Sequence, residues 1–305
     1  MENVRDDKRK GREEMNRKAA AVLVGVMTAS ILTGCGTGDS GTETTSKSEA
    51  DATTSATEEE STSASKSADD TEQTKILVAA AASLKNVYDD ELIPMFQDNN
   101  PKIVVEGTYD ASGKLQTQIE EGLEADIFMS AAPKQMNDLN DKSLIETDTM
   151  TDLLENKIVL IVPSTGDSGI TKFEDIANAS SIAIGDPASV PVGQYSQEAL
   201  TNLGIWDNIQ DKLSLGTNVT EVLNQVAAKS ADAGIVYATD AASMPDKVKV
   251  VAEAPKDSVS KAIYPVAVIK DSKHREEAKA FVDFLKTPEA IKVFEDYGFT
   301  DALSQ

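Results

Sequence analysis

The chain is poor in the residues that most enzymes and metal centres need. Among its 305 residues there is one cysteine, Cys35, and one histidine, His274. A single cysteine excludes an intrachain disulfide and a thiolate cluster for structural zinc or an iron-sulfur centre. A single histidine leaves one base for a Ser/His/Asp or Cys/His relay, and His274 stands in a charged segment without a paired nucleophile. The sequence therefore predicts a protein that is not an enzyme.

Positive charge is also scarce. The chain has 29 Lys and Arg residues against 52 Asp and Glu residues, which gives a formal net charge of -23. Proteins that bind nucleic acids neutralise phosphates with Lys and Arg, and an acidic chain repels those phosphates. We therefore expect no nucleic-acid partner.

Residues 1–34 have the pattern of a bacterial lipoprotein signal peptide. Basic residues are concentrated in 1–18, and an uncharged, mostly apolar stretch follows over 19–32. That stretch is shorter than the roughly 20 residues that a membrane-spanning helix needs. It ends in Leu32-Thr33-Gly34-Cys35, which resembles a lipobox, where the cysteine carries a lipid. We expect Cys35 to anchor the protein to the outer face of the cell membrane; the alternative is an ordinary signal peptide with an incidental cysteine.

A tether is expected over residues 35–74. From 36 to 74 the segment consists mainly of Ser, Thr and acidic residues, and alanine is its only hydrophobic residue type. Such a segment has no apolar surface whose burial offsets the entropy of ordering, so it is predicted to be disordered.

The remaining residues, 75–305, alternate short apolar runs with helical patterns. Apolar runs that predict strands lie at 75–82, 103–107, 126–130, 158–162, 181–184, 234–237, 248–252 and 263–269. Helical patterns lie at 84–96 (with a kink or break at Pro94), 113–121, 194–203 and 219–229, and two more close the chain, the last with Thr287 as N-cap. Alternating strands and helices predict an α/β fold with mostly parallel sheets flanked by helices. We expect two lobes, one formed by 75–157 with about 245–305 and the other by 158–244.

Polar residues or bare amides follow several of these strands. Ser83 follows the first strand, and Ser112 follows the second and precedes its helix. Val192 and Val219 stand at the starts of two further helices, the latter behind the predicted cap Asn218. Ligands of open α/β sheets bind at the carboxyl ends of the strands, and helix N-termini present free N–H groups to anions. For each Ser or Asn alone, plain N-capping is the alternative interpretation.

Several segments, taken in order, resemble the periplasmic molybdate-binding proteins of molybdate ABC transporters. The segments are Ala80-Ala81-Ala82-Ser83-Leu84, Ala125-Asp126-Ile127-Phe128-Met129-Ser130-Ala131, Gly185-Asp186-Pro187-Ala188-Ser189-Val190-Pro191-Val192-Gly193-Gln194-Tyr195, Leu203-Gly204-Ile205-Trp206, Gly234-Ile235-Val236-Tyr237-Ala238-Thr239-Asp240-Ala241 and Tyr297-Gly298-Phe299. The resemblance covers essentially all of 75–305. It implies a type II periplasmic-binding-protein fold with the ligand in the hinge cleft.

The resemblance also implies a ligand set. The oxyanion ligands fall on Ser83 and Ser112 (hydroxyl and amide), Val192 and Val219 (amides) and Tyr237 (phenol hydroxyl), with the Ala131 amide as an additional candidate. The metal is held inside its oxyanion, so no side chain ligates it directly and no cofactor is expected. One departure is Asp110, an acidic residue beside the expected anion site.

The function implied is an extracytoplasmic lipoprotein that captures molybdate, and also tungstate, for an ABC permease and its ATPase. Such receptors are usually monomers. Alternatives that stay open at this point are a receptor for another tetrahedral oxyanion such as sulfate, and a surface lipoprotein without a transport role.

Overall fold

The computed structural model describes residues 73–304. The predicted signal peptide, the predicted lipidation site Cys35 and almost all of the predicted tether lie outside the described residues. Within 73–304, no helix is long and apolar enough to cross a membrane.

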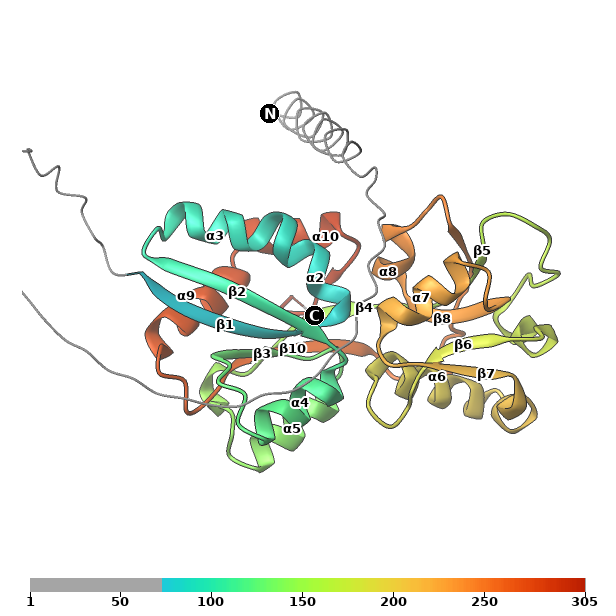
Figure 1. Cartoon of the computed structure of the whole chain (residues 1–305), viewed down its shortest axis with the longest axis horizontal. Helices are drawn as coiled ribbons and strands as arrows, with labels where there is room; N and C mark the ends of the chain where they lie inside the picture. The colour runs from blue at the N-terminus through green and yellow to red at the C-terminus, as the bar shows by residue number, and fades with distance from the viewer. Residues whose placement is uncertain (1–72, 305) are drawn as a thin grey trace, which may run out of the picture. The chain divides into compact units, whose positions relative to one another are not determined.

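Residues 73–304 form a six-stranded sheet and a five-stranded sheet, each flanked by helices (Figure 1). We call each sheet with its helices a lobe. In sheet order, the first lobe contains β11 (Thr300–Asp301), β4 (Thr151–Asn156), β10 (Ala262–Val268), β3 (Ile127–Met129), β1 (Thr74–Ala81) and β2 (Ile103–Asp110). The second contains β7 (Leu213–Gly216), β6 (Ile182–Gly185), β8 (Ala233–Tyr237), β5 (Ile158–Pro163) and β9 (Val248–Glu253).

The helices divide between the lobes in the same way. The first lobe has α2 (Lys85–Val87), α3 (Ile93–Asn99), α4 (Ser112–Glu120), α5 (Pro133–Asp141), α9 (Arg275–Leu285) and α10 (Pro288–Asp296). The second has α6 (Pro191–Asn202), α7 (Val219–Ala227) and α8 (Ala238–Ser243). The α/β fold class predicted from the sequence is confirmed.

The strand directions are more mixed than the sequence predicts. β1 pairs in parallel with β2 and β3, and β6 pairs in parallel with β7 and β8, as helical crossovers require. In contrast, β10 is antiparallel to β3 and β4, and β5 is antiparallel to β8 and β9. β5 enters the second lobe directly from β4, so it starts at the edge of the sheet where β8 ends. Ile158 at the start of β5 therefore lies opposite Tyr237 at the end of β8, and the two strands run in opposite directions.

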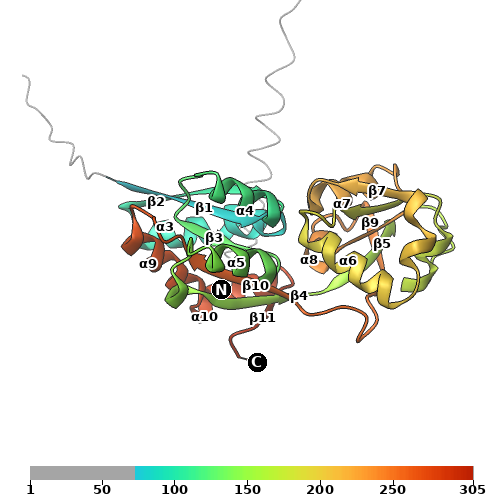
Figure 2. The same cartoon turned by 90° about the horizontal axis from the view of Figure 1, so that it is seen from below.

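One expected lobe boundary is wrong. The sequence assigns everything from about residue 245 to the first lobe, yet β9 pairs with β5 in the second sheet, with Leu160 opposite Ala252. β5 is apolar and buried from Ile158 to Val162, so its second edge needs a partner strand. The chain therefore returns to the first lobe after β9, through residues 254–261, and enters β10 there (Figure 2).

Aromatic packing holds the C-terminal helices on the first lobe. The Phe96 ring of α3 lies 5.0 Å from the Phe281 ring of α9 at an edge-to-face angle of 87°. Tyr88 contacts both Phe281 and Phe294 of α10. All four side chains are buried, and burying each apolar side chain of this size contributes about 1.5 to 3 kcal/mol. The helices α9 and α10 are thus part of the first lobe's core.

Pro94 does not end its helix. The residues before it, Tyr88–Leu92, form a π-helical turn, and α3 continues to Asn99. Proline lacks an N–H and its ring collides with the carbonyl four residues earlier, so a wider turn absorbs it.

Candidate functional site

The loops at the carboxyl ends of the strands carry the hydroxyls and amides that the sequence predicts as ligands. In the first lobe, Ser112 begins α4 directly after β2 and is fully buried. Its Oγ accepts a hydrogen bond of 3.0 Å from the Ala131 amide, which follows β3. The hydroxyl proton of Ser112 remains available for a further acceptor. Ser112 and the additional candidate Ala131 therefore lie together, with the Ala131 amide already bonded to Ser112.

Ser83 lies in a 3₁₀ turn, Ala82–Leu84, immediately after β1. Its Oγ is 3.0 Å from the hydroxyl of Tyr264 on β10. Asn156, the last residue of β4, lies on the other side of the same hydroxyl, with Nδ2 3.3 Å from it. Neither Tyr264 nor Asn156 is predicted from the sequence as part of the site.

In the second lobe, Val192 and Val219 lie in the first turns of α6 and α7. Amides in the first turn of a helix have no acceptor within that helix. The predicted cap Asn218 is confirmed, since its side chain accepts a 3.0 Å hydrogen bond from the Glu221 amide. Both valine side chains are buried, which anchors these two helix starts in the core.

Tyr237 ends β8, and only 1% of it is exposed. Its hydroxyl donates a 3.3 Å hydrogen bond to the Ala131 carbonyl of the first lobe. Burial raises the pKa of the Tyr237 hydroxyl well above its ordinary value, with smaller contributions from Tyr264, Tyr195 and Asp240. The group therefore stays protonated and keeps its capacity to donate.

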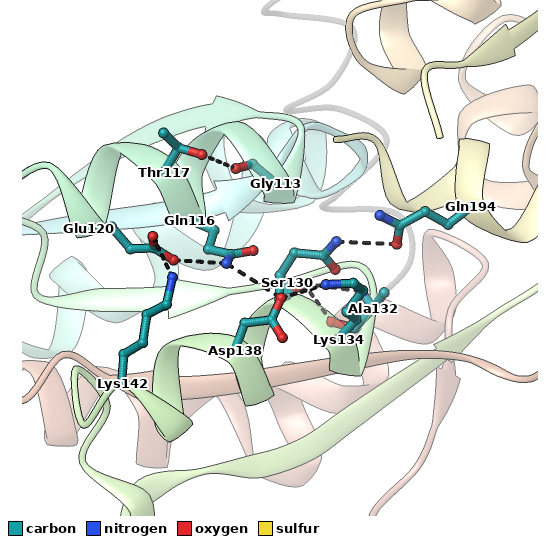
Figure 3. Close-up of polar contacts among 11 residues, drawn as sticks. Gly113, Gln116, Thr117, Glu120, Ser130, Ala132, Lys134, Asp138, Lys142 and Gln194 are labelled. Carbon is teal, nitrogen blue, oxygen red and sulfur yellow. Dashed lines mark hydrogen bonds and ion pairs between the residues drawn. The ribbon is translucent and has the colours of Figure 1, made fainter. Parts of the chain in front are cut away.

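Four of the hydrogen bonds between the two lobes lie around the predicted ligands. Tyr237 to Ala131 is one of them. The other three run from the Gly113 amide to the Ser189 carbonyl (3.0 Å), from Asn218 Nδ2 to Asp110 Oδ1 (3.3 Å) and from Gln135 Nε2 to Gln194 Oε1 (3.2 Å). Figure 3 shows the last of these on Gln194, beside the polar side chains of α4 and α5. Tyr237 and Ala131, and residues within two positions of Ser112, Val192 and Val219, thus meet at one junction between the lobes.

Asp110, the departure noted in the sequence, accepts three hydrogen bonds at this junction. One of its oxygens, Oδ1, accepts from the Ala111 amide at 2.8 Å, from Lys114 Nζ at 3.4 Å and from Asn218 Nδ2 at 3.3 Å. The Asp110 carboxylate is therefore bonded to groups at the start of α4 and to Asn218 of the opposite lobe.

A pocket of about 650 Å³ opens beside the junction. Its lining comes from both lobes: Ala82, Lys85 and Tyr109 from the first, and Thr217, Asn218, Thr220, Glu221, Asn224, Gln225 and Ser230 from the second. Ala82 precedes Ser83 and Asn218 precedes Val219, so the pocket adjoins two of the predicted ligands.

The one histidine lies elsewhere. His274 lines a second pocket, of about 410 Å³, in the first lobe. There Ser272 Oγ donates to Asp126 and accepts from the His274 amide, so this serine is held in a structural loop. Among residues 73–304, no group of three or more His, Cys, Asp or Glu side chains is placed to hold a metal ion.

The chain is similar to known proteins along most of its length. Residues 76–300 match the family of bacterial extracellular solute-binding proteins. A putative ABC transporter substrate-binding lipoprotein of Bacillus subtilis, YvgL, is 42% identical over 232 residues, which are 76% of this chain and 88% of that protein. The molybdate-binding protein ModA of Escherichia coli is 39% identical over 236 residues, 75% of this chain and 90% of that protein.

A solved structure has the same fold. It is the substrate-binding domain of a putative molybdenum ABC transporter from Clostridium difficile, 38% identical, with a TM-score of 0.60 over 75% of this chain and all of that one. The family binds solutes and does not catalyse reactions on them, which agrees with the expectation that the protein is not an enzyme. The chain belongs to the bacterial extracellular solute-binding protein family.

Proposed function

We propose that the protein captures molybdate, and also tungstate, outside the cell and delivers it to an ABC permease and its ATPase. The ion is held by the hydroxyls of Ser83, Ser112 and Tyr237 and by the amides of Ser83, Ser112, Val192 and Val219. The observation that carries the proposal is the junction of Ser112, Ala131 and Tyr237, where polar groups of both lobes already meet. Relatives named for molybdate binding support the choice of ion.

The donor set suits a fully deprotonated tetrahedral ion. Hydrogen bonds to a charged acceptor contribute about 1.5 to 3 kcal/mol each, so five to seven of them offset the desolvation of a dianion. No Lys or Arg is among the donors. Residues 75–305 carry 20 basic and 37 acidic residues, a net charge of -17. The negative net charge slows the approach of an anion. The affinity for the bound ion depends instead on the oriented N–H and O–H dipoles around it.

Size separates molybdate from sulfate in this proposal. Both ions lack a proton at neutral pH, so both match a pocket made of donors. Sulfate is smaller, and contacts that it fails to make with the cavity wall are lost outright. A hydrogen phosphate ion differs in another way, because its O–H needs an acceptor.

The direct test is a calorimetric titration of the purified protein with molybdate, tungstate, sulfate and phosphate. We expect one site per chain, with molybdate and tungstate bound more tightly than sulfate. Sulfate binding more tightly than molybdate makes the protein a sulfate receptor, and no binding of any oxyanion favours a surface lipoprotein without a transport role.

A matched pair of variants locates the site. Tyr237→Phe removes a proposed ligand hydroxyl, and we expect it to weaken molybdate binding. Tyr195→Phe removes the hydroxyl of a neighbouring ring, 6.5 Å away between centroids, which bonds to the Lys261 carbonyl instead. Equal effects of the two variants contradict the assignment of Tyr237.

The location of the protein is part of the same proposal. The lipid on Cys35 holds a monomer at the outer face of the membrane through the tether. Cys35→Ala then releases the protein from the membrane fraction, and a variant that stays with the membrane contradicts the anchor.

A further inference from the structure

An acidic side chain stands beside a site that is proposed to hold an anion. Asp110 is the last residue of β2, two residues before Ser112, and its side chain is 29% exposed. A carboxylate repels a neighbouring dianion, and partial burial weakens the screening of that repulsion by salt. As a neighbour of the ion alone, Asp110 is therefore unfavourable for the proposed function.

Three donors hold the Asp110 carboxylate in place. The Ala111 amide donates to Oδ1 at 2.8 Å, which fixes the side chain at the end of its own strand. Lys114 Nζ lies 3.4 Å from the same oxygen, four residues further along the chain. The third donor, Asn218 Nδ2 at 3.3 Å, belongs to the second lobe. The carboxylate thus joins one lobe to the other.

The orientation of the Asn218 amide follows from its capping role. Its Oδ1 accepts a 3.0 Å hydrogen bond from the Glu221 amide, so the oxygen end of the side chain faces α7. The nitrogen end, which only donates, then faces Asp110. Asn218 directly precedes Val219, whose amide is a proposed ligand. One side chain therefore caps α7 and connects the start of α7 to the first lobe.

We propose, on the basis of the function proposed above, that Asp110 and Asn218 form a latch that holds the two lobes closed on the bound ion. Both are positioning residues, because they act through the adjoining segments that carry Ser112 and Val219. A hydrogen bond between the lobes forms only when the lobes come together, so it stabilises the closed, ligand-bound state over the open one. Lys114 partly neutralises Asp110, which lowers the repulsion between the latch and the ion.

The sign of the change in Asp110→Ala separates a latch from simple repulsion. Removing a negative charge alone strengthens the binding of a dianion. Removing a hydrogen bond to a charged group weakens it, and we expect the dissociation constant for molybdate to rise about tenfold. The rise should come from faster release of labelled molybdate with little change in the association rate, because the contact exists only in the closed state.

Asp89→Ala is the matched control. It also removes an acidic side chain of the first lobe, but the partners of Asp89 are Lys85 and Tyr109 of that same lobe. We therefore expect no loss of molybdate affinity and no faster release.

Two substitutions at Asn218 keep a helix cap and change the latch. Serine and aspartate are both favoured N-caps, so Asn218→Ser and Asn218→Asp preserve the start of α7. Asn218→Ser lacks the amide donor, and we expect the same tenfold loss, with no further loss when Asp110→Ala is added. Asn218→Asp sets two carboxylates against each other, and we expect a larger loss. Adding Asp110→Asn to Asn218→Asp exchanges donor and acceptor at the wild-type net charge, and affinity should recover.

Calorimetric titration with molybdate, and thermal unfolding without it, decide between the outcomes. Ligand-free unfolding close to that of the wild type shows that a variant is folded. Wild-type or tighter binding by folded Asp110→Ala or Asn218→Ser overturns the latch while the molybdate site stands, and so does a double variant that binds no better than Asn218→Asp. A wild-type protein that binds no oxyanion overturns the proposed function and the latch together.

Discussion

Gly113 offers a sharp test of whether the lobes must close on the ligand. It is the second residue of α4, and its amide donates to the Ser189 carbonyl of the second lobe. A Cβ added at Gly113 lies 2.4 Å from that carbonyl oxygen and 2.9 Å from Ser189 Cα. Ordinary contact begins at 3.4 Å, so Gly113→Ala forces this point of the junction open by about 1 Å. Both neighbours are backbone atoms, so a side-chain rotation does not relieve the contact.

The loss of molybdate affinity in Gly113→Ala follows from the separation of the two lobes at this point. A hydrogen bond of about 3 Å that lengthens by about 1 Å is lost. If two donors of one lobe lose contact with the ion, at about 1.5 to 3 kcal/mol each, binding weakens by about 3 to 6 kcal/mol. This corresponds to a dissociation constant about 10² to 10⁴ times higher.

The fold of the variant is expected to survive. Gly113 lies in a helix, where alanine is favoured over glycine by about 1 kcal/mol. Thermal unfolding without ligand should therefore match that of Thr117→Ala, an exposed change one turn further along the same helix (Figure 3). Gly193→Ala is the contrasting case, because its Cβ meets the Gly185 carbonyl oxygen at 2.1 Å within one lobe. That variant should lose stability itself.

Calorimetric titration with molybdate measures the effect, and small-angle scattering with and without the ion shows whether the lobes still draw together. We expect Gly113→Ala to bind weakly and to change little in scattering. Wild-type affinity in Gly113→Ala refutes the reasoning, because the ion is then held without the junction seen between Gly113 and Ser189.

Three further predictions concern single side chains. Ser112→Ala removes a proposed ligand hydroxyl and the acceptor of the Ala131 amide, so titration should show molybdate binding weaker by about 1 to 3 kcal/mol; unchanged affinity places the site elsewhere. Burial raises the pKa of Asp240 to about 7, and its Oδ2 has no hydrogen-bond partner among the described residues. The folded protein keeps a proton there that the unfolded chain releases above about pH 4, so this group lowers stability as pH rises from about 4 to 7, by up to about 4 kcal/mol. Urea unfolding of Asp240→Asn at pH 5 and pH 8 should lack that slope, and an identical slope contradicts the assignment. Arg275 is half exposed and pairs with the buried Glu146 carboxylate, so Arg275→Ala should lower the urea midpoint at pH 7; an unchanged midpoint shows that the pair contributes nothing.

The parts of the fold that could be predicted are those whose signal is local. β1 and β5 are continuous apolar runs that are buried in the structure, and such runs identify strands covered on both faces. The sequence predicts the caps Asn218 and Thr287 because capping depends on residues within one turn, and each side chain accepts a hydrogen bond from an amide in the first turn of its helix. Local chemistry is enough for elements of this kind.

Other elements depend on neighbours that are distant along the chain. β4, with the sequence Thr-Asp-Leu-Leu-Glu-Asn, has too few apolar residues to stand out, and it forms a strand because β10 and β11 pair with its two edges. α5 is rich in Asn, Asp and Lys, so its sequence does not predict a helix either, yet its Met136 and Leu139 side chains are buried. The apolar content of α5 is low because only one narrow face of it is covered. In β4, the apolar signal is confined to Leu153 and Leu154, which are buried on opposite faces.

The candidate site divides in the same way. Ser83 and Ser112 stand at predicted strand ends, so their positions follow from the order of elements. Tyr264 reaches Ser83 across 181 residues of sequence, and Asn156 reaches Tyr264 across 108. In the sequence these two residues look like an ordinary buried aromatic and a polar strand end. Their contacts near Ser83 form only because the sheet brings β10, β4 and the turn after β1 together.

A crystal structure of the protein bound to molybdate tests the central claim most directly. The account predicts a single tetrahedral ion between the lobes, within hydrogen-bond distance of the Ser83, Ser112 and Tyr237 hydroxyls and the Val192 and Val219 amides. It predicts that no Lys or Arg side chain touches the ion. An ion coordinated by lysines, or one bound in the pocket beside His274, contradicts the account.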